Sequence, residues 1–206
     1  VARAIGACHL DSGALYRALT AIAAELPSPS PAAILEAAGK RRLGLREIAG
    51  EMVPFLDDAP AEPLIRTPAV TALVSEVSAL PQVREWVNHR LREAAHRAGL
   101  VVLDGRDIGT AVFPAAAVKV FLTATPEARA RRRLLQRGDT PTEVEVAREA
   151  AMLAERDRKD STRSVAPLTQ AKDAVLLDTT SLEFDQQVQR IVGLVRERLQ
   201  RSPGRS

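Results

Sequence analysis

Residues suited to phosphate chemistry follow a short apolar run near the start of this 206-residue chain. Cys8-His-Leu leads into Asp11-Ser12-Gly13, and Arg17 lies one helical turn beyond Ser12. Ser12 is of the type that caps a helix, and an arginine on the first turns of that helix can meet an anion. The heptapeptide from Asp11 to Arg17 also fits an ordinary helix start with a surface arginine, so by itself it leaves both interpretations open.

A second group of polar residues follows the apolar run Leu100-Val-Val-Leu103. It reads Asp104-Gly-Arg-Asp-Ile-Gly-Thr110. An acidic residue at the end of a buried parallel strand can organise Mg²⁺, the glycines let the backbone approach a phosphate closely, and Arg106 can contact that phosphate. The alternative is a glycine-rich turn with a solvated salt bridge.

A third group combines charge with helical spacing. Arg156, Asp160 and Arg163 are spaced by four and then three residues, which places a carboxylate between two guanidinium groups on one helical face. The alternative to a binding role is a solvated charge ladder, that is, a row of solvent-exposed charged residues along the helix. The preceding predicted helix carries a basic run, Arg129, Arg131, Arg132 and Arg133. Two cationic helices joined by a connection suit a mobile lid over nucleotide phosphates.

A fourth group lies on or beside predicted helices and consists of Ile65-Arg-Thr67, Ser75 and Arg84. Alone it is uninformative, since polar residues on amphipathic helices usually face the solvent.

The elements around these groups predict a doubly wound α/β core. Uninterrupted apolar runs at 100–103, 118–122 and 174–177 predict strands buried on both faces of a parallel sheet. Weaker β-like runs occupy 42–48 and 51–56. Helices are expected at 14–26, from Pro68, from Pro81 to near Gly99, at 126–137, at 141–161 behind a capping box Thr140-Pro-Thr-Glu143, and at 184–199. The segment Val1–Gly6 reads as the last turns of a helix whose start precedes this sequence.

Composition excludes several classes of protein. Hydrophobic residues make up 46% and the formal net charge is +3, a weak field beside that of nucleic-acid binders. Aromatic residues at 3% leave few stacking platforms for RNA. Cys8 is the single cysteine, so it forms no internal disulfide, and we expect a cytoplasmic protein without a membrane span.

Taken in order, the motifs resemble the bacterial-type cytidylate kinase family. They are LDSGALYR (10–17), IRT (65–67), Ser75 followed by LPxVRE (80–85), LDGRDIGTAVFP (103–114), RARRR (129–133) and RDRKDSTRSVAPL (156–168). The resemblance covers nearly the whole chain. It implies an ATP-dependent, Mg²⁺-assisted enzyme that phosphorylates CMP and dCMP, acting as a monomer without nucleic acid.

The resemblance also implies a fold and its domains. The fold is a P-loop NTPase-like, doubly wound parallel sheet with an inserted α+β acceptor-binding domain. Residues 1–30 and 100–206 would form the kinase core, with a lid at about 129–163, and residues 31–99 the insert. The GxxxxGKS/T phosphate loop and its central strand are missing, and Gly39-Lys40 is a decoy because Ile34 and Arg41 occupy the motif's glycine and Ser/Thr positions.

Roles carry over residue by residue from the resemblance. Ser12, Arg17, Arg106 and Arg156 would hold the acceptor phosphate or its approach, with Tyr16 also in the substrate site. Ser75, Arg84 and Asp107 would read cytosine, Asp160 and Arg163 would meet the ribose and transferring phosphates, Asp104 would lie near Mg²⁺, and Arg129, Arg132 and Arg133 would serve the lid. Lys159 and Ser161 stand where the family often has arginine, and Asp58 stands where it has a loop glycine.

Alternatives remain on the sequence alone. The chain could be a truncated or inactive nucleotide-binding homologue, or another small-molecule kinase of the same fold, such as a uridylate or shikimate kinase. An RNA-binding role is favoured by the pI alone.

Overall fold

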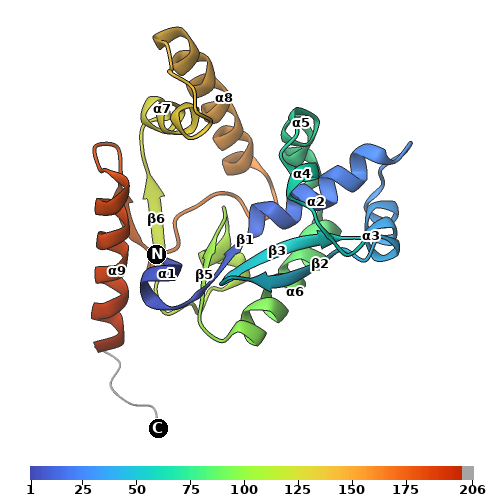
Figure 1. Cartoon of the computed structure of the whole chain (residues 1–206), viewed down its shortest axis with the longest axis horizontal. Coiled ribbons are helices and arrows are strands. Elements are labelled where there is room, and N and C mark those ends of the chain that lie inside the picture. Colours follow the sequence, from blue (N-terminus) through green and yellow to red (C-terminus); the bar gives the residue numbers. More distant parts are fainter. Residues whose placement is uncertain (201–206) are drawn as a thin grey trace. The chain divides into compact units, whose positions relative to one another are not determined.

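The computed structural model describes residues 1–200 and divides into two compact units. The amino-terminal unit comprises Ala2–Ile108, and the carboxyl-terminal unit runs from Gly109 onward, with Val1. Figure 1 shows the elements of each unit. The boundary falls at Gly109, whereas the sequence placed boundaries near residues 30 and 100. Those expected domain limits stay a prediction.

A mixed sheet forms the base of the amino-terminal unit (Figure 1). Its strands are β1 (Cys8–Asp11), β2 (Gly44–Ile48), β3 (Glu51–Leu56), β4 (Ala59–Pro60) and β5 (Val101–Asp104), in the order β2-β3-β1-β5 with β4 beside β3. β1 pairs in parallel with both β3 and β5, while β2 and β3 form an antiparallel hairpin. A parallel sheet is therefore present as predicted, but of the three strands expected in it only the one at 100–103 takes part. Those at 118–122 and 174–177 pair with each other in a separate sheet, and β3 joins from the segment that the sequence assigned to the insert.

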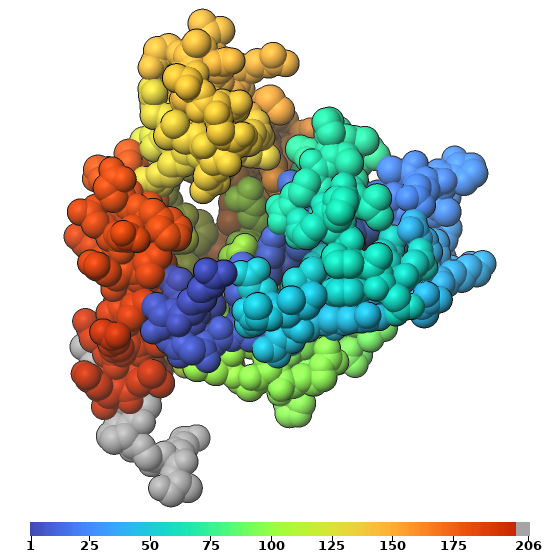
Figure 2. All heavy atoms as spheres, viewed as in Figure 1, coloured from blue at the N-terminus to red at the C-terminus, as the bar shows by residue number. Residues whose placement is uncertain are grey.

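Helices cover this sheet and supply most of the core. They are α1 (Ala2–Ile5), α2 (Ser12–Glu25), α3 (Pro31–Lys40), α4 (Glu62–Ile65), α5 (Pro68–Val77) and α6 (Pro81–Ala98). α2 packs against α3, α4, α5 and α6 as well as β3 and β5, so it is the central helix of the unit. Its Leu15, Leu19 and Ile22 are almost fully buried. Figure 2 shows that the atoms of α5 and the β2–β3 ribbon fill one continuous surface.

The helix boundaries follow local signals. Thr67 caps α5 by accepting a hydrogen bond from the Val70 amide, and Pro68 occupies the first helical position, as predicted. α6 ends at Gly99, whose φ of 76° lies in the left-handed region that glycine adopts freely. The structure adds a helix that the sequence reading missed, α3, which Ser30 caps after the proline-rich stretch.

The carboxyl-terminal unit contains the π-helical turn η1 (Ile108–Val112), strands β6 (Val120–Thr123) and β7 (Val175–Asp178), and helices α7 (Pro126–Gln136), α8 (Glu143–Thr162) and α9 (Phe184–Gln200). β6 and β7 pair in parallel. α7 and α8 form an antiparallel hairpin, visible in Figure 1, with a small core of its own made of Ala130, Leu134, Val146, Ala150 and Leu153.

Two expectations for this unit were wrong. The capping box of α8 pairs Thr142 with Glu145, not Thr140 with Glu143. Both registers satisfy the T-x-x-E pattern, and Glu143 instead forms an ion pair with Arg131 at 2.8 Å. The strands are also less buried than predicted, since Leu122 is 53% and Leu176 56% exposed. Helices cover the faces of a buried parallel sheet, and these exposed leucines show that such cover is incomplete here.

No helix among residues 1–200 is both long enough and apolar enough to cross a membrane.

Candidate functional site

The carboxyl ends of β1 and β5 bring two predicted groups together in the amino-terminal unit. The parallel register places Asp11 opposite Asp104, although the two residues lie far apart in the sequence. Ser12 begins α2 and donates a hydrogen bond from Oγ to the Asp104 carbonyl oxygen at 2.9 Å. A Cβ on Gly105 would lie 2.3 Å from Ser12 Oγ, so only glycine permits this close approach.

Asp104 carries the clearest electrostatic perturbation of this strand edge. Removal of water by surrounding protein atoms, and then the Asp11 carboxylate, raise the pKa of Asp104, while its hydrogen bond with His9 Nε2 at 2.6 Å opposes the rise. Asp11 is partly balanced by Arg66, 3.7 Å away. Two neighbouring carboxylates therefore stand at the sheet edge with their charge only partly compensated.

This pair of carboxylates fits a magnesium ion that also contacts substrate phosphates. Mg²⁺ is commonly held by one or two carboxylates and keeps several water molecules, so a cage of protein ligands is unnecessary. Residues 1–200 contain no group of three or more His, Cys, Asp or Glu side chains arranged for a metal. The register that sets Asp11 opposite Asp104 is the observation that favours a cation here, and the raised pKa of Asp104 agrees with it, since a positive charge would stabilise the ionised form.

Cys8 lies at the other end of β1 and is unsuited to nucleophilic chemistry. It is buried, and burial raises the pKa of its thiol, with Glu47 and Glu51 adding to the effect.

A buried ion pair joins two residues that the sequence assigned to base recognition. Arg84 on α6 donates a hydrogen bond from Nη2 to Asp107, and their side chains are 3% and 6% exposed. Arg84 also donates to the Ser78 carbonyl oxygen at 2.9 Å and lies over the Tyr16 ring, 5.5 Å from its centroid. Salt bridges this deeply buried need several partners to offset desolvation, and Arg84 has them.

Arg17 is likewise held inside the unit. It is 8% exposed and donates a hydrogen bond to Thr71 Oγ1 at 3.0 Å, with a longer contact to the Ile65 carbonyl oxygen. Ser75 lies on α5, one turn beyond Thr71, and is half-buried. Arg106 follows β5 and is also half-buried. The structure thus places every predicted residue of this unit on α2, α5, α6, β5 or the segment after β5.

The carboxyl-terminal unit holds the predicted Arg-Asp-Arg group at the end of α8. Asp160 is 4% exposed, with Arg156 Nε at 3.9 Å and Arg163 Nη1 at 3.8 Å from its carboxylate oxygens. The backbone carbonyl of Asp160 accepts a hydrogen bond from the Leu168 amide at 2.8 Å. The predicted spacing is confirmed. Because Asp160 is buried, the group is not a solvated charge ladder.

The three predicted lid arginines on α7 each contact other protein groups. Arg129 pairs with Asp157, and Arg133 pairs with the buried Glu149 at 2.9 Å. Arg132 donates hydrogen bonds to the carbonyl oxygens of Thr179, Thr180 and Leu182, which follow β7. The first two face carboxylates, which a phosphate could replace, whereas Arg132 joins the hairpin to the segment after β7.

Sequence reasoning missed two residues of these sites. His9 alternates with Asp11 along β1, so the pattern could have placed both on one face. Glu149 is the centre of an Arg133 and Arg137 cluster between α7 and α8. In the sequence, the only sign of this role was that Glu149 is an acidic residue on the same helical face as the apolar Val146 and Leu153.

The fold and these residues define a class: a mixed α/β protein with a parallel sheet whose strand ends gather carboxylates, glycines and arginines, as in enzymes that bind phosphate groups. A family model described as cytidylate kinase matches residues 1–197. The chain belongs to the cytidylate kinase family.

Curated relatives agree with the family model. The cytidylate kinase of Ligilactobacillus salivarius is 43% identical over 204 residues, covering 96% of this chain and 89% of that protein. That of Lactiplantibacillus plantarum is 39% identical, covering 95% and 86%. A bifunctional pantoate ligase/cytidylate kinase of Synechococcus elongatus is 38% identical over 205 residues, which make up 39% of that longer protein.

Asp104→Asn should raise the melting temperature at neutral pH by a small amount, because the Asp104 side chain is 63% exposed and water screens its interactions. Because folding raises the pKa of Asp104, the folded chain binds this proton more tightly than the unfolded chain, and the ionised group costs stability above the ordinary carboxyl pKa. The amide still accepts the His9 hydrogen bond. The gain should shrink as the pH falls and vanish below about pH 4, as followed by thermal unfolding from pH 3 to 8.

The matched control for this experiment is Asp178→Asn at the end of β7. Hydrogen bonds from Thr180 lower the pKa of Asp178, so its replacement should decrease stability at neutral pH. An Asp104→Asn variant that melts below the wild type at pH 7 would contradict the assignment.

Arg84→Met should lower the free energy of unfolding by about 3–5 kcal/mol, because it leaves the buried Asp107 carboxylate without its main partner. The double variant Arg84→Met/Asp107→Leu should recover most of this loss. Denaturant unfolding monitored by Trp86 fluorescence reports on this unit. Additive losses in the double variant would show that the two side chains do not interact.

Proposed function

We propose that this protein transfers the γ-phosphoryl group of ATP to CMP and dCMP, giving CDP and dCDP. The match of residues 1–197 to the cytidylate kinase family, with curated relatives 36–43% identical, carries this proposal. The buried polar pairs described above support it, because a site that recognises a base by hydrogen bonds needs donors and acceptors held in fixed positions.

Each unit by itself holds groups that fit part of a nucleotide. Ser12, Arg17, Arg106 and Arg156 would hold its phosphate, Ser75, Arg84 and Asp107 would recognise cytosine beside Tyr16, and Asp160 with Arg163 would meet the ribose and the transferring phosphates. The support is chemical. One guanidinium group can bind two phosphate oxygens through parallel hydrogen bonds, and Arg84 and Asp107 present a donor and an acceptor side by side.

The reaction would be a direct in-line transfer. The acceptor phosphate is already an anion, so no dedicated base is required, and the protein's contribution is positioning and neutralisation of the charge on the equatorial oxygens. Arg106, Arg156 and Arg163 would supply the positive charge for this neutralisation. Asp104, with Asp11 beside it, would hold Mg²⁺, which would supply positive charge against the phosphates of ATP.

The lid hairpin would bring further cations to the phosphates. Arg129 and Arg133 would exchange Asp157 and Glu149 for phosphate oxygens, while Arg132 would hold the base of the hairpin through its carbonyl contacts. Such an exchange keeps each guanidinium paired with an anion in both states, and the buried Glu149, which would give up Arg133, keeps its ion pair with Arg137.

We also propose that activity requires one further parallel strand and a GxxxxGKS/T loop. In the described residues β5 pairs only with β1, and β6 only with β7, so each keeps one unpaired edge. The protein would work as a monomer in the cytoplasm, where ATP and CMP are available and the single Cys8 stays reduced.

Arg156→Ala, in a chain extended upstream by such a strand and loop, should lower kcat about 100- to 1,000-fold, because its contact strengthens as charge develops in transfer. Loss of the ion pair with the buried Asp160 should also lower the melting temperature, but the variant should remain folded at the assay temperature. A coupled assay of CDP formation measures this. Arg148→Ala, an exposed arginine on the same helix, is the control and should retain full activity. Equal activity of the two variants would show that Arg156 has no part in transfer.

The 206 residues alone should show no ATP-dependent phosphorylation of CMP, because they lack the backbone cradle and lysine that hold the donor phosphates. The extended chain should be active in the same assay. Turnover by the 206 residues at an ordinary kinase rate would contradict the proposed donor site. An extended chain that binds CMP without turnover would instead identify an inactive nucleotide-binding homologue.

A further inference from the structure

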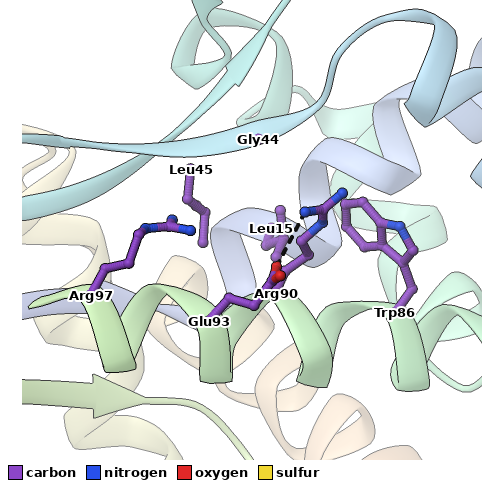
Figure 3. Close-up of a pocket in the computed structure, with 7 residues that line it drawn as sticks. All are labelled: Leu15, Gly44, Leu45, Trp86, Arg90, Glu93 and Arg97. Atoms are coloured by element: carbon purple, nitrogen blue, oxygen red, sulfur yellow. Dashed lines mark hydrogen bonds and ion pairs between the residues drawn. The ribbon is translucent and has the colours of Figure 1, made fainter.

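A small cavity lies on the face of α6 that points away from Arg84, within the amino-terminal unit (Figure 3). It measures about 160 Å³. The lining residues come from α2, β2 and α6, and they are Leu15, Gly44, Leu45, Trp86, Arg90, Glu93 and Arg97. None of these residues belongs to the proposed nucleotide site, so the cavity is a separate feature of the unit.

The cavity has an apolar floor and a charged rim. Figure 3 shows Leu15 at the back and the Leu45 side chain descending from β2, with Trp86 at one end. Leu15 is fully buried, and Trp86 is half-buried. A cavity of about 150 Å³ lined by apolar side chains is large enough for benzene, so this space suits one six-membered ring.

The charges on the rim leave one positive charge in excess. Arg90 lies over the Trp86 ring, 5.2 Å from its centroid, and pairs with Glu93 at 3.2 Å. Among the described residues, no carboxylate pairs with Arg97. Arg97 is in the last turn of α6, where a cation also favours the helix dipole, but Figure 3 shows its guanidinium directed toward Leu45 rather than past the helix end.

We propose that this cavity binds a planar, single-ring organic monoanion such as an aromatic carboxylate. The ring would lie on Leu45 against Trp86, and the carboxylate would pair with Arg97 through two parallel hydrogen bonds. Glu93 neutralises Arg90 and disfavours a dianion, so a monoanion matches the net charge of the rim. This binding site is separate from phosphoryl transfer, since the cavity and the proposed nucleotide site have no residue in common.

Trp86 is the only tryptophan, so its fluorescence reports directly on the cavity. Benzoate should change Trp86 emission saturably, and calorimetry should give the same affinity. Benzamide, which has the same ring without charge, should bind at least tenfold more weakly. Inorganic phosphate should not compete. Binding of phosphate as tight as that of benzoate would overturn the proposal, and so would the absence of saturable benzoate binding.

Two variants test the geometry. Arg97→Ala removes the exposed partner of the carboxylate and should weaken benzoate binding at least tenfold, whereas Arg190→Ala, an exposed arginine on α9, should leave it unchanged. Leu45→Phe keeps every charge but fills the floor, and should also abolish binding. Wild-type affinity in Arg97→Ala, or displacement of benzoate by CMP, would overturn the assignment of a separate site.

Discussion

The parallel pairing of β1 with β5 is the constraint on which the amino-terminal site depends. It sets Asp11 opposite Asp104, lets Ser12 reach the Asp104 backbone and requires glycine at position 105. A shift of one residue in this register would turn the strand-end side chains to the other face of the sheet. The carboxylates, the first turn of α2 and the segment that carries Arg106 and Asp107 are therefore positioned by one set of backbone hydrogen bonds.

Buried ion pairs are the second feature that shapes this protein. Arg84 with Asp107, and Asp160 with its two arginines, are removed from water at a cost that ion pairing only partly offsets. Apolar residues of similar volume would serve stability at least as well. Such pairs are useful where a polar ligand must find its donors and acceptors already oriented, and this is the reason to connect them with nucleotide recognition.

The α7–α8 hairpin shows how a charged element can remain a well-defined structure. Its small apolar core is supplemented by Glu149, which is 7% exposed and contacts both Arg133 and Arg137. The arginines that give the hairpin its positive charge thus also join its two helices. A lid built in this way can present cations to phosphate without losing its own packing.

Local signals determined much of what the sequence by itself settled. Thr67-Pro68, Pro81 and Gly99 mark helix ends because caps, prolines and left-handed glycines act within a few residues, and the 4-then-3 spacing placed Asp160 between its arginines. The ordered motifs settled the family. The start of α8 was predicted two residues early because Thr140 and Thr142 satisfy the same capping pattern.

Only the tertiary structure decided which distant segments meet. The pairing of β3 with β1, the contact of His9 with Asp104, the burial of Glu149 and the cavity beside Trp86 all join residues whose separation along the chain carries no local signal. Apolar runs indicated strands but not how far neighbours would cover them, which is why β6 and β7 are more exposed than predicted. Burial and pairing depend on the partners that surround a segment, and periodicity within the segment does not contain that information.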